Sequence, residues 1–151
     1  MVSKDIIEGI TFVQEYMINH DVSVVAVHNN EVICFRSEQD FIEFFDFIKE
    51  IDSDYFNCFI GIKFLGKPEA LLLRYINVKG VYIQKGTMKG IATLIVGNIP
   101  HQIDMLIKMD QKSIFDDRQE DLRKIVYYID DPLKAYDLLN EKILHRLIHS
   151  H

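Results

Sequence analysis

The side chains best suited to bind a ligand are six basic residues in the middle of the chain. Residues 57–100 carry these six against a single acid, Glu69, so the segment has a net charge of +5 (6 − 1). Ammonium and guanidinium groups bind phosphates, and a tyrosine ring can stack on a nucleobase. The pattern predicts an anion-binding surface for a nucleotide or a nucleic acid. Its candidate residues are Lys63, Lys67, Arg74, Lys79, Tyr82, Lys85 and Lys89.

The charge of the rest of the chain leaves two other interpretations of this basic segment open. Residues 1–56 carry −9 (3 basic, 12 acidic) and residues 101–151 carry −2 (8 basic, 10 acidic), which with +5 gives the total of −6. The acidic and basic parts could complement each other within the fold or across a homodimer. Alternatively, the acidic face, which is dense from Glu38 to Asp54, could meet a basic protein surface. The pI near 5.4 is the opposite of a typical nucleic-acid binder.

Metal-binding side chains cluster at the end of the chain. Glu141, His145 and His149 recur at i, i+4 spacing, which places them on one face of a helix. Such a stripe could hold zinc or nickel, but a lone terminal helix offers few groups to orient the ligands. The stripe is therefore interpreted as a solvated polar face, and no metal or cofactor is predicted.

No nucleophile has the sequence context of a catalytic residue. The serines fall mostly at positions typical of helix caps and turns, and no Cys-x-x-Cys motif is present. Cys34 and Cys58 each lie in an apolar run, which predicts two buried, reduced and unreactive thiols. The glycine-rich run 85–90 lacks P-loop spacing and is interpreted as a turn. An enzyme with an unrecognised site stays a third alternative, with no catalytic residue assigned.

The first third of the chain carries clear local signals. A helix is predicted from the N-cap Ser3 to about Asn19, on the helical spacing of its apolar residues. Two β-rich runs, 22–28 and 31–36, flank Asn29-Asn30, a pair that tolerates positive φ and predicts a tight hairpin. A second helix is predicted from the capping signal at 37–40 to about residue 51.

The remaining elements lead to an α+β fold in one domain, residues 1–151. Four strands are predicted at 58–65, 70–76, 80–85 and 91–96, and their short connections imply antiparallel neighbours. Helices are predicted after Pro100, from Ser113 to about Asp130, and from Asp131-Pro132 to the terminus. The predicted fold is an antiparallel sheet of five to six strands, with a βαβββ-type core order. An N-terminal helix and two to three C-terminal helices flank the sheet.

The leading functional hypothesis is a small, non-enzymatic protein that docks onto another protein, has a regulatory role and self-associates as a homodimer. Its motive is a surplus of large apolar side chains, some of which should stay exposed on a monomer. These include Phe41, Phe44, Phe45, Phe47, Val126, Tyr127, Tyr128, Ile129, Tyr136 and Leu147. The composition, rich in Ile, Phe, Asn and Lys, is typical of AT-rich genomes and suggests a viral or phage accessory protein. No membrane segment or signal peptide is predicted, so the cytoplasm is the expected location.

Overall fold

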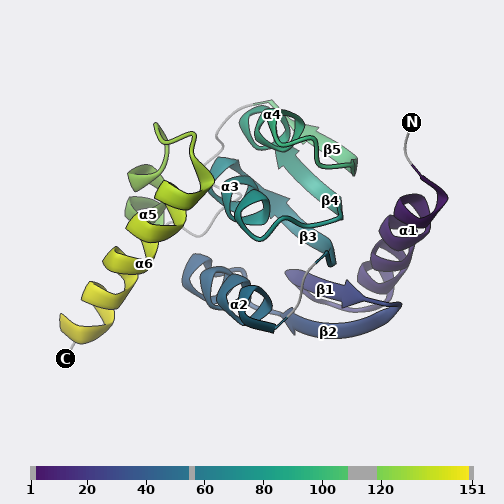
Figure 1. Ribbon diagram of the computed structural model, residues 1–151, viewed down its shortest axis with the longest axis horizontal. Coiled ribbons are helices and arrows are strands. Elements are labelled where there is room, and N and C mark those ends of the chain that lie inside the picture. Colours follow the sequence, from purple (N-terminus) through teal and green to yellow (C-terminus); the bar gives the residue numbers. More distant parts are fainter. Residues whose placement is uncertain (1–2, 55–56, 109–118, 150–151) are drawn as a thin grey trace.

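A mixed five-stranded sheet forms the centre of the computed structural model, which describes residues 3–54, 57–108 and 119–149 (Figure 1). The elements are α1 (Lys4–Asn19), β1 (Val24–His28), β2 (Glu31–Arg36), α2 (Phe41–Asp54), β3 (Phe59–Leu65), α3 (Lys67–Tyr75), β4 (Gly80–Thr87), α4 (Met88–Val96), β5 (His101–Ile107), α5 (Glu120–Ile125) and α6 (Pro132–His149). The strand order is β2-β1-β3-β4-β5. The fold is thus of the α+β type.

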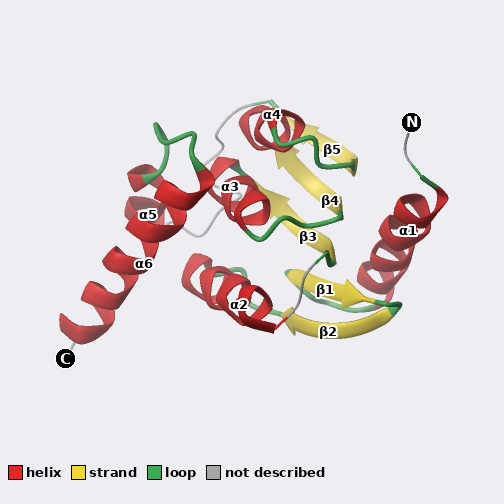
Figure 2. Cartoon of the chain, viewed as in Figure 1, coloured by secondary structure: helices red, strands yellow, loops and turns green. Residues whose placement is uncertain are grey.

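Helices cover both faces of the sheet (Figure 2). α1 packs on one face, while α2, α3 and α4 pack on the other, with α5 and α6 outside them (Figure 1). The alternation of side chains along β1 supplies both cores. Val25 and Val27 belong to the cluster under α1, whereas Val24 and Ala26 belong to the larger cluster under α2 and α3.

The predicted purely antiparallel sheet is wrong. β3 pairs with β4 in parallel, and β4 pairs with β5 in parallel. The cause is that the segments 70–76 and 91–96 were predicted as strands, whereas residues 70–75 lie in the crossover helix α3 and residues 91–96 in α4. Parallel neighbours need such a crossover, because the chain has to return to the same end of the sheet. The helix predicted after Pro100 is instead the edge strand β5.

The two crossover helices are specified by their ends rather than by their middles. The Glu69 carboxylate accepts a hydrogen bond from the Gly66 N–H (3.1 Å) at the start of α3. The Thr87 hydroxyl accepts one from the Gly90 N–H (3.0 Å) at the start of α4. An asparagine with positive φ follows each helix: Asn77 (57°) follows α3 and Asn98 (56°) follows α4. Asparagine tolerates this left-handed region of the backbone.

The strongest local predictions are confirmed. The Ser3 hydroxyl caps α1 by accepting from Ile6 N–H (3.3 Å), and the helix ends at Asn19 as predicted. Asn29 and Asn30 adopt φ of 51° and 62° in the hairpin between β1 and β2. The last helix begins at Pro132. The helix predicted from Ser113 starts outside the described residues, and its described part is helical over Glu120–Ile125.

Candidate functional site

A pocket of about 600 Å³ lies between α3, α4 and the turn that joins α5 to α6. Its volume is within the range of small-molecule sites. Each helix contributes residues at i, i+4 and i+7, which is one helical face. The lining residues are Lys67, Leu71 and Arg74 of α3, Lys89, Ala92, Thr93 and Val96 of α4, and Tyr127, Tyr128 and Asp130 of the turn.

The Lys67 ammonium is held at the start of α3, largely out of water. Its side chain is only 14% exposed. Nζ donates hydrogen bonds to the Tyr127 carbonyl oxygen and to Asp130 Oδ1, both at 2.8 Å. A charge screened from solvent interacts more strongly with a nearby opposite charge than an exposed one does. Lys67 is therefore a fixed and largely buried cation of the pocket.

Asp130 places a carboxylate in the field of two of these cations. Its hydrogen bond with Lys67 and the Lys67 charge lower the pKa of Asp130, and the Arg74 charge lowers it further. The Asp130 side chain is 91% exposed. Because this carboxylate is open to solvent, an anion from solution can reach Lys67 at the same place.

Arg74 and Lys89 complete the basic lining. Arg74 crosses over Gly97, where a Cβ would lie 2.7 Å from Arg74 Nε. Lys89 Nζ lies 3.7 Å from the centre of the Tyr127 ring and donates a hydrogen bond to the Tyr127 hydroxyl. Three cations against the Asp130 carboxylate give the lining a net charge of +2 (3 − 1).

Three of the seven predicted binding residues thus line one pocket, and three other lysines lie elsewhere. Lys63 is on β3, 3.8 Å from an Asp21 carboxylate oxygen. Lys79 precedes β4, near the opposite end of α3 from Lys67, with its ammonium 5.7 Å from the Phe59 ring centre. Lys85 lies 5.6 Å from the centre of the Phe64 ring. The structure therefore divides the predicted basic surface.

Tyr82 does not offer its ring to a ligand. The residue is 1% exposed and belongs to the core under α1. Burial and a hydrogen bond donated to the Asp104 carboxylate raise the pKa of Tyr82 to about 12. Stacking on a base needs an exposed ring, whereas the central strand β4, which is buried along most of its length, places the Tyr82 ring in the core.

The turn residues Tyr127, Tyr128 and Asp130 were not among the predicted binding residues. They enter the pocket from a segment about 40 to 60 residues further along the chain than α3 and α4. Asp130 lies where one predicted helix ends and the next begins, and a carboxylate at a helix start is already explained by capping. The adjacent tyrosines were assigned to a docking surface. No local pattern links them to the lysines.

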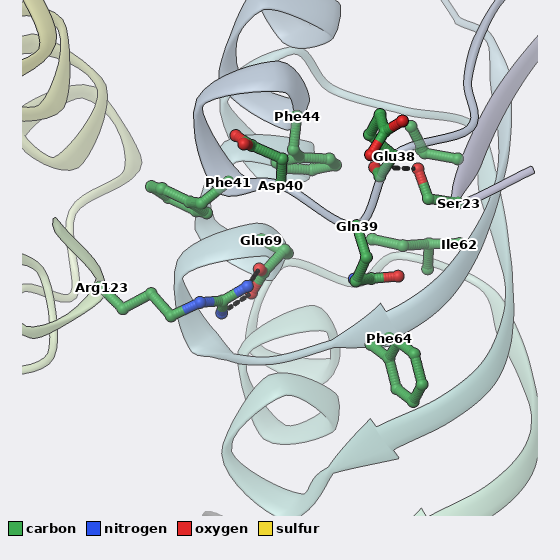
Figure 3. A pocket seen from close by; sticks show the side chains of 11 residues that line it. Ser23, Glu38, Gln39, Asp40, Phe41, Phe44, Ile62, Phe64, Glu69 and Arg123 are labelled. Atoms are coloured by element: carbon green, nitrogen blue, oxygen red, sulfur yellow. Dashed lines mark hydrogen bonds and ion pairs between the residues drawn. The ribbon is translucent and has the colours of Figure 1, made fainter. Parts of the chain in front are cut away.

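A second, small pocket of about 20 Å³ lies at the N-terminal ends of α2 and α3 (Figure 3). Arg123 reaches into it from α5 and pairs with Glu69, which is 3% exposed, at 3.0 Å. Gln39 Oε1 is buried beside this pair without a hydrogen-bond partner among the described residues. The volume suits roughly one water molecule, which is too small for an organic ligand.

The two cysteines are buried and free. Burial, and a hydrogen bond donated to Glu50, raise the pKa of the Cys34 thiol to about 11. Burial raises the pKa of Cys58 to about 11 as well. At pH 8 the thiolate fraction of each is on the order of 100-fold below that of a free cysteine.

We expect both thiols to react slowly with an aromatic disulfide reagent at pH 8 and quickly once guanidinium unfolds the protein. The release of the coloured thiol, followed by absorbance, measures both rates. Fast reaction of either thiol in the native protein would show an accessible thiolate and would restore cysteine as a candidate nucleophile.

The polar stripe of Glu141, His145 and His149 lies on α6. Among the described side chains, which do not include that of His149, no group of three or more His, Cys, Asp or Glu residues could hold a metal ion. Within the described part of the chain, no helix combines the length and the apolar character needed to cross a membrane.

Comparisons with known proteins bear on the fold alone. No family model matches the chain, and no curated protein matches it. A solved structure with a similar fold is that of a DUF1893 family protein from Thermotoga maritima, with a TM-score of 0.69. The two chains are 15% identical, and the similarity covers 94% of this chain and 92% of the other. At this identity the similarity shows a shared fold.

Proposed function

We propose that this protein binds a small anionic ligand of the phosphate class in the pocket between α3, α4 and the turn after α5. The observation that carries the proposal is the Asp130 carboxylate, which lies against Lys67 and in the field of Arg74. This exposed carboxylate occupies the position that a ligand anion would take.

The charge and burial of the lining favour an anion over a neutral ligand. Two cations, Arg74 and Lys89, lie at the pocket in addition to the partly buried Lys67. Hydrogen bonds from charged donors are roughly twice as strong as those between neutral groups, and a phosphate oxygen can receive several of them. A ligand phosphate that replaces Asp130 at Lys67 would therefore gain more than the displaced carboxylate loses.

The docking hypothesis rested partly on exposed phenylalanines of α2, and these are not exposed. Phe41, Phe44, Phe45 and Phe47, expected to leave some apolar surface exposed, are all buried. Tyr128 and Leu147, which the same hypothesis named, are exposed. Among the described residues, other exposed apolar side chains lie on α4, β5 and α6, and include Met88, Ile95, Val96, Met105, Leu106, Leu144 and Ile148. A role in docking or self-association stays a prediction, and the mass of the native protein in volatile buffer would report its subunit number directly.

Isothermal titration with inorganic pyrophosphate tests the proposed function. We expect saturable binding that weakens between 50 mM and 200 mM salt, because the attraction is ionic. Arg74→Gln and Lys89→Gln should each weaken binding roughly tenfold or more, the loss expected for one charged hydrogen bond.

Lys79→Gln is the matched control. It removes the same charge from the same basic segment, but Lys79 does not line the pocket. Its affinity should stay within about twofold of the unmodified protein. Absence of binding at millimolar pyrophosphate, or an equal loss in the Lys79 variant, would contradict the proposal.

A further inference from the structure

The pocket holds more than a set of cations, because two tyrosines form the wall contributed by the turn. The Tyr127 and Tyr128 rings meet edge to face, with centres 5.2 Å apart and planes at 79°. Lys89 covers a face of the Tyr127 ring. Tyr128, by contrast, is 89% exposed although it lines the pocket. Its ring therefore offers open aromatic surface beside the basic groups.

The part of the lining that α4 contributes suits an apolar group. α4 contributes Ala92 and the largely exposed Val96 to this pocket. A phosphate ion would contact the cations and leave this part of the roughly 600 Å³ empty. Exposed aromatic rings next to cations are the usual elements that bind a nucleobase and its phosphate, since every base has a π-face.

Building on the proposed function, we propose that the ligand is an aromatic phosphate ester the size of a nucleoside monophosphate. Its phosphate replaces the Asp130 carboxylate at Lys67 and Arg74, and its base stacks on Tyr128. The net charge of −6 disfavours a long nucleic acid, because the rest of a polyanion would face an acidic surface. A free mononucleotide places its charge within the pocket alone.

Titrations with three probes separate the phosphate from the base. Adenosine 5′-monophosphate should bind roughly tenfold more tightly than ribose 5-phosphate, the gain expected from stacking one base, and adenosine alone should bind weakly. Tyr128→Ala should abolish the tenfold advantage of the nucleotide and leave the affinity for ribose 5-phosphate unchanged. Tyr128→Phe keeps the ring and should retain the advantage. Because Tyr128 is exposed, neither variant should unfold the protein.

The outcomes distinguish this inference from the proposed function. Equal affinities for nucleotide and ribose phosphate, or an unchanged Tyr128→Ala variant, would overturn the aromatic ligand and leave the anion site intact. Failure of the nucleotide, ribose 5-phosphate and pyrophosphate alike would overturn both. Retention of the tenfold advantage by Tyr128→Phe together with its loss in Tyr128→Ala supports the stacked base.

Discussion

Replacing Arg123 by methionine is expected to lower the free energy of unfolding by about 3–5 kcal/mol, the usual result of removing one partner of a buried ion pair. Glu69 is 3% exposed and the Arg123 side chain is 11% exposed. Methionine preserves most of the side-chain volume, so the loss would come from the unpaired Glu69 carboxylate. Urea denaturation followed by circular dichroism measures the change.

A more exposed ion pair, which joins α5 to α6, provides the control. Arg146 pairs with Asp121, and both side chains are substantially more exposed, at 35% and 62%. Arg146→Met should therefore cost about 1 kcal/mol or less. Glu69→Gln combined with Arg123→Met should recover part of the stability, since glutamine can still accept the hydrogen bond of Gly66 N–H. Equal losses in the two arginine variants would show that the Glu69 pair is not desolvated.

The Arg123 pair also positions the candidate site. Gln119 Oε1 accepts a hydrogen bond from Ile42 N–H (2.8 Å), and Arg123 binds Glu69, so α5 is tied to the starts of both α2 and α3. The turn that follows α5 carries the two tyrosines and Asp130 to the lysines of α3 and α4. Loss of the Arg123 pair should therefore loosen one wall of the pocket as well as the fold.

The parts of the fold that could be predicted are those with a local signal. The Ser3 cap, the Asn29-Asn30 turn and Pro132 each fix the backbone through their own side chains. The central residues of α3 and α4 carry no local pattern of this kind. The run 70–73 is buried on every side, between the sheet and α6, so it shows no helical alternation of apolar and polar residues. The capping groups at Glu69 and Thr87 are the available evidence, but Glu69 lies in a short connection between two predicted strands and Thr87 in the run 85–90 interpreted as a turn.

The error over α3 and α4 also obscured the candidate site. Lys67 and Arg74 are seven residues apart, which is two helical turns and one face, but opposite faces of a strand. Once the segment is a helix, these two residues converge with Lys89, while Lys79 falls at the far end. The tyrosine wall could not be predicted, since only the tertiary packing of α5 brings it to α3.

A stability measurement can distinguish whether the phenylalanines of α2 form a core or a docking surface. We expect Phe45→Ala to lower the free energy of unfolding by about 3–5 kcal/mol. Phe45 is 1% exposed, and its ring stacks on Tyr136 of α6 with centres 5.2 Å apart. Tyr136 in turn stacks on Tyr75 of α3 at 4.0 Å. The substitution would leave a cavity and remove one ring from the stack that joins α2, α6 and α3.

Phe35→Ala on the edge strand β2 is the matched control, because the same side chain is removed from a half-exposed position. Its cost should be about 1 kcal/mol or less. If Phe45 belonged to a docking surface, its removal should cost little free energy of unfolding, because an exposed phenylalanine can be removed without loss of monomer stability. If urea denaturation gave Phe45→Ala no greater loss than Phe35→Ala, α2 would present its aromatic face outward and the docking hypothesis would regain its motive. The expected difference of several kcal/mol would instead direct the search for a docking surface to the exposed apolar side chains of α4, β5 and α6.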